Sequence, residues 1–291
     1  MLDKKKIYYF IENITPPFVF KILKANFLYK YVKDFFTKFS KQRIPEIVTI
    51  QKGTLSGAKL FLCPEGNWQK EMMNDTYDSE LFDYVQKKNW EGKVIYDIGA
   101  HIGYHSLKFS ELVGASGSVY AFEPNKVNVE RFEKILSINS PTFENVRIFD
   151  VALSDKEGTT DFFSTENIEG GTSTGGFVDE ADTLWTRDTY INKTGFLSSK
   201  VEIKTLDKLI DSKEILKPDL LKIDVEGAEQ LVLSGFLKHL PESQPIILIE
   251  FHSIYSAYSC MKILTKHNYK TTLLKKESDG RVMIVAEPLK N

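Results

Sequence analysis

The chain alternates between short apolar runs and segments with apolar residues at helical spacing, a pattern that is typical of an α/β protein. The apolar runs have the length of buried strands and cover residues 94–98, 118–122, 146–151, 220–225, 245–251, 270–274 and 282–286. Strands that alternate with helices predict parallel pairing through right-handed crossovers. The last two runs follow a single helix, so we expect them to form an antiparallel hairpin at the edge of the sheet.

Helical spacing predicts helices at 79–89, 104–113, 127–138, 205–210, 228–240 and 255–267. Alternating residues predict further short strands within 47–62 and at 159–163 and 200–204, whereas residues 66–78 show no regular pattern. The long loop between residues 163 and 200 is rich in glycine, threonine and serine. Loops of this length in a compact domain are usually functional or disordered, and residues 170–173 are a candidate substrate lid.

Residues 1–45 differ from the rest of the chain in charge and pattern. They carry ten lysines and arginines against three acids, and residues 17–40 predict an amphipathic helix with aromatic residues every fourth position. We therefore expect a basic helical arm, residues 1–45, and a second domain, residues 46–291. Two interpretations of the helix stay open: packing on the domain or on a second subunit, and contact with an anionic membrane surface.

Composition narrows the class of protein. A chain of 291 residues with 42% hydrophobic content can bury a full α/β core. It has no apolar run long enough to span a membrane and no convincing signal peptide. Cys63 and Cys260 show no metal-binding spacing, which favours free thiols and a cytoplasmic location, with peripheral attachment to the inner face of the membrane as an open option. The net charge of −2 divides into +7 for residues 1–45 and −9 for the remainder, and a mildly acidic body with a basic arm argues against nucleic-acid binding.

Residues 94–106 predict a strand, a glycine turn and a helix, the unit that binds nucleotide-like cofactors in doubly wound sheets. Gly99 and Gly103 bracket the turn, where glycine lets a ligand approach the backbone. Glu123 follows about 20 residues later at the end of the next strand, where an acid can accept hydrogen bonds from ribose hydroxyls. This arrangement predicts a cofactor site, to which Ala100 and Pro124 are expected to contribute.

The turn favours S-adenosylmethionine over NAD. A dinucleotide fingerprint places a glycine for the pyrophosphate where this chain has His101. S-adenosylmethionine carries no phosphate, and Asp97 suits its cationic ammonium or sulfonium group. Both are arguments from charge and space alone, so an NAD-dependent oxidoreductase or epimerase stays open as an alternative.

Further cofactor contacts are expected at the end of the third strand and before the first. Asp150 can accept from the adenine amino group, with Val151 and Ala152 as apolar neighbours of the ring. Tyr77, in the irregular segment 66–78, is placed to fold over the ligand. The structural alternatives are a strand-end cap for Asp150 and a surface turn for the segment that holds Tyr77.

Two more strand ends carry candidate catalytic residues. Asp224 and Glu226 follow one apolar run, and Glu250 and His252 follow the next. We expect Asp224 or His252 to be the base that takes the proton of a hydroxyl, with Glu250 orienting the substrate. Helix capping explains Asp224 and Glu226 equally simply, and a backbone hydrogen bond explains His252. Asp224, Glu250 and His252 are also the residues that would hold a divalent metal, if one is used.

Together these motifs resemble the FkbM family of S-adenosylmethionine-dependent methyltransferases over roughly residues 68–252. The shared segments are Asp97-Ile-Gly-Ala-His-Ile-Gly103, Phe122-Glu-Pro124, Ala152-Leu-Ser-Asp155, Thr205-Leu-Asp207, Lys222-Ile-Asp-Val-Glu-Gly-Ala-Glu229 and Ile249-Glu250. The resemblance implies a class I methyltransferase fold, Rossmann-like, with a seven-stranded mostly parallel sheet, helices on both faces and an antiparallel final strand. It also implies O-methylation of a sugar-containing acceptor in a glycan, glycolipid or metabolite. His101 departs from the asparagine that many members have. The remaining alternative is a non-catalytic membrane-binding or partner-binding protein that keeps the fold.

Overall fold

A computed structural model describes residues 45–63, 67–165, 176–179, 181, 196–277 and 280–289. The basic arm, apart from its last residue, and the candidate lid at residues 170–173 lie outside these ranges. The predicted helix at 17–40 and the division at residue 45 therefore stay predictions. Within the described part, no helix is both long enough and apolar enough to cross a membrane.

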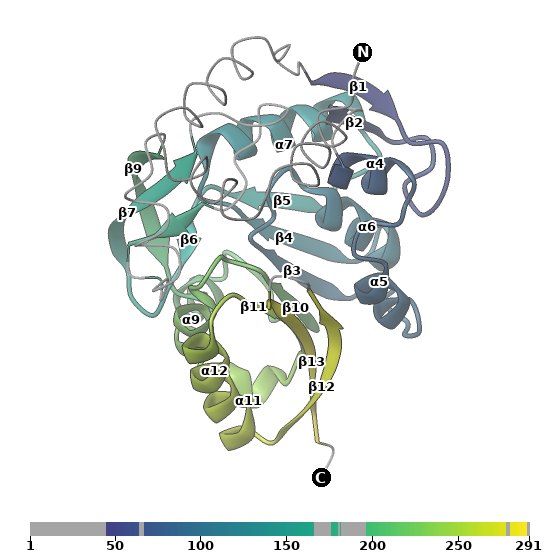
Figure 1. The fold of residues 1–291 in the computed structure, drawn as a ribbon. Coiled ribbons are helices and arrows are strands. Elements are labelled where there is room, and N and C mark those ends of the chain that lie inside the picture. The colour runs from purple at the N-terminus through teal and green to yellow at the C-terminus, as the bar shows by residue number, and fades with distance from the viewer. Residues whose placement is uncertain are drawn as a thin grey trace, which may run out of the picture. The chain divides into compact units, whose positions relative to one another are not determined.

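A seven-stranded sheet forms the centre of the described part (Figure 1). Its strands are β3 (Val94–Ile98), β4 (Ser118–Phe122), β5 (Val146–Phe149), β10 (Leu220–Ile223), β11 (Ile246–Phe251), β12 (Tyr269–Lys276) and β13 (Val282–Pro288). They pair in the order β12-β13-β11-β10-β3-β4-β5, and β13 runs antiparallel to both of its neighbours while the other pairs are parallel. The predicted class I fold and its terminal hairpin are confirmed.

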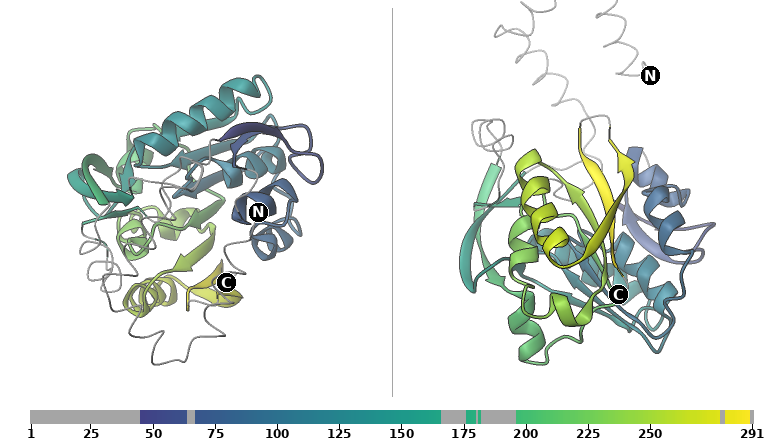
Figure 2. Two further views of the ribbon diagram at one scale, coloured as in Figure 1. Left: turned by 45° about the horizontal axis from the view of Figure 1, so that its top comes forward. Right: turned by 90° about the horizontal axis from the view of Figure 1, so that it is seen from below.

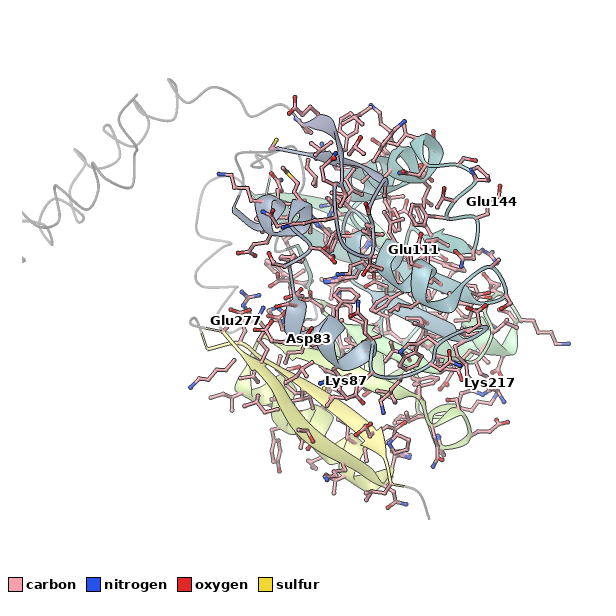
Figure 3. All side chains as sticks on the ribbon, turned by 90° about the vertical axis from the view of Figure 1, so that its right-hand side faces the viewer. Asp83, Lys87, Glu111, Glu144, Lys217 and Glu277 are labelled. Carbon is pink, nitrogen blue, oxygen red and sulfur yellow. The ribbon has the colours of Figure 1, made fainter. Side chains whose placement is uncertain are left out.

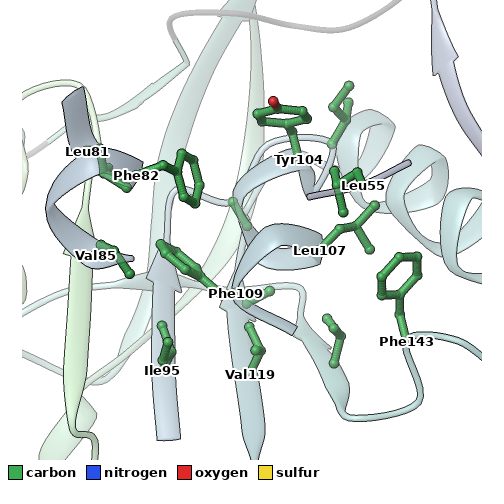
Figure 4. Packing of buried hydrophobic residues seen from close by; sticks show 14 of the residues in the cluster. Leu55, Leu81, Phe82, Val85, Ile95, Tyr104, Leu107, Phe109, Val119 and Phe143 are labelled. Atoms are coloured by element: carbon green, nitrogen blue, oxygen red, sulfur yellow. The ribbon is translucent and has the colours of Figure 1, made fainter. Parts of the chain in front are cut away.

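Helices cover both faces of this sheet because successive side chains of a strand point to opposite faces. Ile95 packs in a cluster with the apolar side of three helices, whereas its neighbour Tyr96 packs in a cluster with three others. The first set is α5 (Ser79–Val85), α6 (Tyr104–Val113) and α7 (Lys126–Ile138), and the second is α9 (Leu206–Asp211), α10 (Glu229–Ser234) and α12 (Ile254–Lys266). The two sets lie on opposite sides of the sheet in Figure 2. Figure 4 shows Phe82 and Phe109 facing Ile95 and Val119 of the sheet.

Two smaller sheets flank the central one. The short strands expected within 47–62 are confirmed as β1 (Glu46–Thr49) and β2 (Lys59–Leu62), which pair antiparallel in a hairpin. The other is four-stranded, with β6 (Ala152–Leu153), β9 (Phe196–Lys204), β7 (Gly158–Thr165) and β8 (Phe177–Val178) in that order. It buries its own small apolar cluster, which includes Phe162, Phe177 and Ile203. The strands predicted at 159–163 and 200–204 are confirmed, and they are the antiparallel partners β7 and β9.

Several boundaries differ from those that we expected. Residues 67–73 of the irregular segment form a helix, α4 (Asn67–Met73). The expected helix at 228–240 is broken, because α10 ends at Ser234 and a short α11 (Leu240–Ser243) follows. At the break, a Cβ on Gly235 would lie 2.0 Å from the carbonyl oxygen of Ser154. The chain therefore passes too close to a neighbouring segment for a side chain there.

Charged side chains of both signs, among them Asp83, Lys87 and Glu111, point away from the core (Figure 3). Both cysteine side chains are buried and neither forms a disulfide, as the sequence led us to expect.

The two glycines of the turn after β3 make room for the protein's own atoms. A Cβ on Gly99 would lie 1.8 Å from the carbonyl oxygen of Asp224, and a Cβ on Gly103 would lie 2.1 Å from the ring of Phe132. Both glycines also have positive φ, 79° and 87°. We expected a ligand to be the neighbour that requires these glycines, but close packing and backbone conformation already require them.

A comparison of Gly103→Ala with Gly57→Ala separates the effect of close packing from the effect of the positive φ. Gly57 has a similar φ of 91°, but a Cβ there meets no atom within 4 Å among the described residues. We expect Gly57→Ala to lower the free energy of unfolding by about 1 kcal/mol, and Gly103→Ala to lower it by roughly 2 kcal/mol more through overpacking. Urea denaturation measures both. Equal losses would show that the ring of Phe132 moves aside without cost.

Candidate active site

A cavity of about 530 Å³ lies where β3, β4, β10 and β11 end at their carboxyl ends. This is the edge at which parallel α/β sheets bind ligands. Eleven of the residues singled out from the sequence line it: Tyr77, Gly99, Ala100, His101, Glu123, Pro124, Val151, Ala152, Asp224, Glu226 and Glu250. Asp97, Gly103, Asp150 and His252 are not among the lining residues.

Glu123 is held in one orientation at the end of β4. Its Oε2 accepts from the backbone N–H of His101 at 2.8 Å, and its Oε1 accepts from that of Asn125 at 2.9 Å. Burial raises the pKa of Glu123 to about 6, although these hydrogen bonds favour the ionised form. The carboxylate is therefore fixed by backbone groups and close to its titration point near neutral pH.

His101 has a left-handed backbone, with φ of 53°, at the position where a dinucleotide-binding turn has a glycine. Burial lowers the pKa of its imidazole to about 4, so the ring is neutral at physiological pH. The ring lies edge-on to Trp68, with 5.7 Å between centroids. Its Nε2 is buried and has no hydrogen-bond partner among the described residues.

Asp97 lies beneath the cavity rather than in its wall. Its side chain is fully buried and accepts a hydrogen bond from the hydroxyl of Ser106 at 2.6 Å. The ammonium of Lys222 lies 3.2 Å from Asp97 and 3.5 Å from Asp224, and it donates to the carbonyl of Gly99 at 3.0 Å. Asp97 therefore meets a lysine where we expected it to meet the cationic part of a cofactor.

Asp150 is exposed and also lies outside the cavity wall. The strand expected at 146–151 ends at Phe149, and Asp150, which follows it, has an exposed side chain. The two residues that follow it, Val151 and Ala152, do line the cavity. Only the apolar part of the expected adenine contact is therefore in place.

Acidic groups gather at the ends of β10 and β11. The two oxygens of Asp224 lie near Lys222 on one side and His252 on the other. Glu226 follows in a left-handed conformation, with φ of 51°. Glu250 accepts from Arg281 at 2.9 Å, and burial together with the charge of Asp224 raises its pKa to about 7.

His252 sits behind this acidic group. Its Nδ1 lies 2.8 Å from Oε1 of Glu229, and its Nε2 lies 3.6 Å from Asp224 and 3.4 Å from Glu226. Burial alone would lower its pKa, but the hydrogen bond to Glu229 and the nearby carboxylates raise it to about 10. Because His252 does not line the cavity, its imidazole is not placed to take a proton directly from a bound acceptor.

The structure adds cavity residues that strand-end reasoning missed. Tyr77 stacks on His105, with 5.6 Å between centroids and 25° between planes. His105 and Lys275 both pair with Asp78, at 3.1 Å and 2.9 Å, and these two partners hold the pKa of Asp78 low against the effect of burial. Lys275 lies on the edge strand β12 and Arg281 directly precedes β13, and nothing in the local sequence marks either residue. Lys222 was visible, since alternation places it on the same side of β10 as Asp224.

A model of the Methyltransferase FkbM domain matches residues 97–271, more than half of the chain. The chain belongs to the FkbM methyltransferase family. The expected S-adenosylmethionine-dependent methyltransferase is thereby confirmed, and family membership favours it over the NAD-dependent and non-catalytic alternatives.

Two relatives and one solved structure are similar to this member of the family. The hexuronic acid methyltransferase AglP of Haloferax volcanii is 26% identical over 196 residues, which cover 67% of this chain and 70% of that protein. The 2-O-methyltransferase NoeI of Sinorhizobium fredii is 27% identical over 169 residues, which cover 57% of this chain and 63% of that protein, less than two thirds of its length. A methyltransferase FkbM from Methylobacillus flagellatus aligns with a TM-score of 0.47 and 12% identity, over 76% of this chain and 55% of that chain.

The substitution Lys222→Met removes the buried ammonium and tests whether this group holds the end of β10 against the end of β3. The change leaves the carboxylate of Asp97 buried without its cation, which typically costs about 3–5 kcal/mol of unfolding free energy. Lys93→Met is the matched control, since Lys93 pairs with Asp219 at 3.0 Å on the surface, and it is expected to cost at most about 1 kcal/mol. Urea denaturation of both variants measures the difference. Similar costs would contradict the role given to Lys222.

Proposed function

We propose that this methyltransferase transfers the methyl group of S-adenosylmethionine to a hydroxyl of a sugar-containing acceptor. The observation that carries the proposal is one cavity that spans the ends of four neighbouring strands, β3, β4, β10 and β11. Glu123, held by backbone N–H groups, stands at one end, and the carboxylates of Asp224, Glu226 and Glu250 stand at the other. The names of two relatives, a hexuronic acid methyltransferase and a 2-O-methyltransferase, support a sugar as the acceptor.

The donor occupies the end of the cavity nearest β3 and β4. Glu123 accepts from a ribose hydroxyl through Oε2, which keeps a lone pair after accepting from His101, whereas Oε1 already accepts from both Asn125 and Asn128. Val151 and Ala152 provide apolar contact for the adenine ring. The methionine part extends along Gly99 and Ala100 toward Asp224. Asp97 does not contact the donor in this proposal; it pairs with Lys222 and so holds that side chain beneath the turn after β3.

Methyl transfer needs alignment and one proton acceptor, because the sulfonium group supplies the reactivity. The hydroxyl oxygen attacks the methyl carbon while the carbon–sulfur bond breaks. The electron pair of the broken bond stays on sulfur, which gives S-adenosylhomocysteine. Asp224 takes the hydroxyl proton, since it lines the cavity and His252 does not. Lys222 lies against one carboxylate oxygen of Asp224, at 3.5 Å, and so helps to fix its orientation. Glu250, fixed by Arg281, orients the acceptor.

Two further parts of the proposal, on membrane contact or self-association and on the class of acceptor, are supported by the sequence alone. Residues 17–40 stay a candidate for peripheral membrane contact at the inner face of the membrane, or for self-association. A nucleic-acid acceptor is not proposed, because basic residues are concentrated in the first 45 positions rather than along the methyltransferase domain.

Glu123→Gln tests the donor end. The amide cannot replace a charged acceptor of ribose hydroxyls, so we expect affinity for S-adenosylhomocysteine to fall roughly 10- to 100-fold. In the unchanged protein, affinity is expected to weaken as pH drops through about 6, where Glu123 gains a proton. The variant should lose this part of the pH dependence, as seen by calorimetric titration between pH 5 and 8. Glu130→Gln, at an exposed position on α7, should match the unchanged protein in both respects.

Transfer of labelled methyl groups to a cell-envelope glycan extract, with mass analysis of the products, tests the function itself. A gain of one methyl mass on a sugar hydroxyl is the expected result. Asp224→Asn should bind S-adenosylhomocysteine within a few-fold of the unchanged protein but lose 100-fold or more in transfer rate, since a general base contributes about 10²–10⁴-fold. Asp83→Asn, at an exposed position on α5, is the control. Label found on protein or nucleic acid instead of sugar would refute the acceptor class.

A further inference from the structure

Three side chains at the ends of β10 and β11 converge in the way that ligands of one cation do. Asp224, Glu250 and His252 each offer one ligand atom, and these atoms all lie within 4.8 Å of one another. An ion bound at about 2.0–2.6 Å places its most distant ligands roughly 4–5 Å apart. Small movements of side chains are therefore enough to enclose a single ion.

The imidazole of His252 gives an independent sign of a missing partner. Its side chain is 9% exposed, and its Nε2 is buried without a hydrogen-bond partner among the described residues. This atom faces the acidic group, 3.6 Å from Asp224 and 3.4 Å from Glu226. An unpartnered nitrogen that points at carboxylates is the arrangement expected where a cation belongs between them.

The other ring nitrogen of His252 is oriented by Glu229. Nδ1 lies 2.8 Å from a carboxylate that is fully buried and that also accepts from the hydroxyl of Ser256 and from the backbone N–H of Gly227 at 2.9 Å. Metal-binding histidines usually donate their second N–H to a carboxylate in this way, which fixes the ring and directs the free nitrogen at the ion.

The charges around the cluster leave room for a cation. Arg281 bonds to Oε1 of Glu250, and Lys222 lies near Oδ2 of Asp224, so that Oδ1 of Asp224 faces the imidazole. Glu226 adds a further carboxylate at the same place. When the ring of His252 is neutral, as binding at Nε2 requires, the carboxylates of Asp224, Glu226 and Glu250 outnumber the two cations Lys222 and Arg281.

We propose that Asp224, Glu250 and His252 bind one divalent cation, and that Glu229 is the positioning residue for His252. Binding at Nε2 requires a neutral ring, so one proton passes to solvent when the ion enters. In a role that rests on the proposed function, the ion coordinates the acceptor hydroxyl and lowers its pKa. The proton of that hydroxyl then passes to the second oxygen of Asp224.

Mn²⁺ is a suitable probe because it accepts both carboxylate and imidazole ligands. The full chain, stripped with a chelator, is titrated with MnCl₂ while electron paramagnetic resonance follows the free ion. We expect one Mn²⁺ per chain, and at least tenfold weaker binding in His252→Asn and in Glu250→Gln. Glu242→Gln, an exposed acid on α11, is the control that should bind as the unchanged protein does.

The positioning role of Glu229 has its own readout. Glu229→Gln keeps an oxygen that can accept from Nδ1, so it should retain more Mn²⁺ affinity than Glu229→Leu. Affinity for S-adenosylhomocysteine reports whether each variant is folded and should stay unchanged. If Glu229→Gln and Glu229→Leu both fold and both bind Mn²⁺ as tightly as the unchanged protein does, Glu229 does not position His252 for the ion.

Failure of this site is distinguishable from failure of the proposed function. The cation site is wrong if the unchanged protein binds no Mn²⁺, or if His252→Asn and Glu250→Gln bind it as tightly as the unchanged protein does. Either result overturns the site even if the chelator-treated enzyme still methylates sugars. Specific Mn²⁺ binding that these two variants lose supports the site, whichever acceptor is methylated.

Discussion

The ammonium of Lys222 is the constraint on which the candidate site depends. It is 2% exposed and meets Asp97, Asp224 and the carbonyl of Gly99 within 3.5 Å. A buried charge is stable only when charged and polar partners surround it, so these contacts hold the end of β10 against the turn after β3. The same approach leaves no space for a Cβ on Gly99. This buried side chain therefore adds to the pairing of β10 with β3 in fixing Asp224 against the turn after β3.

The central elements could be predicted because local signals agree with the fold. β3, α6 and β4 have the predicted limits, since glycines or polar residues end each apolar pattern. The break between α10 and α11 was missed, although Gly235 at the end of α10 is a residue type that often ends a helix. The approach of Gly235 to Ser154, from a distant part of the chain, explains why glycine is required there. The pairing of β7 with β9 could not be predicted either, since 30 residues lie between the two strands.

For the site, sequence identified the correct sheet edge but not the direction of every side chain. Glu123 and Asp224 were found because each follows an apolar strand, and all parallel strands end at one edge. Asp97 satisfied the same rule, yet it is buried beneath the cavity, because a lysine on the neighbouring strand pairs with it. Lys275 and Arg281 were missed, since charged residues of a hairpin at the edge of a sheet usually face solvent and only the folded hairpin brings these two to the cavity.

The acidic end of the cavity also suits the change of charge in the proposed reaction. Before transfer, the donor sulfur is positive and the carboxylate of Asp224 is negative. After transfer, the sulfur is neutral and the proton from the acceptor has neutralised the carboxylate, so the total charge is unchanged while both separate charges disappear. Water would stabilise the separated charges of the reactants, whereas a partly buried site stabilises them less and so favours the neutral products. Lys222 stays charged throughout, and Asp97 is then the carboxylate that balances it.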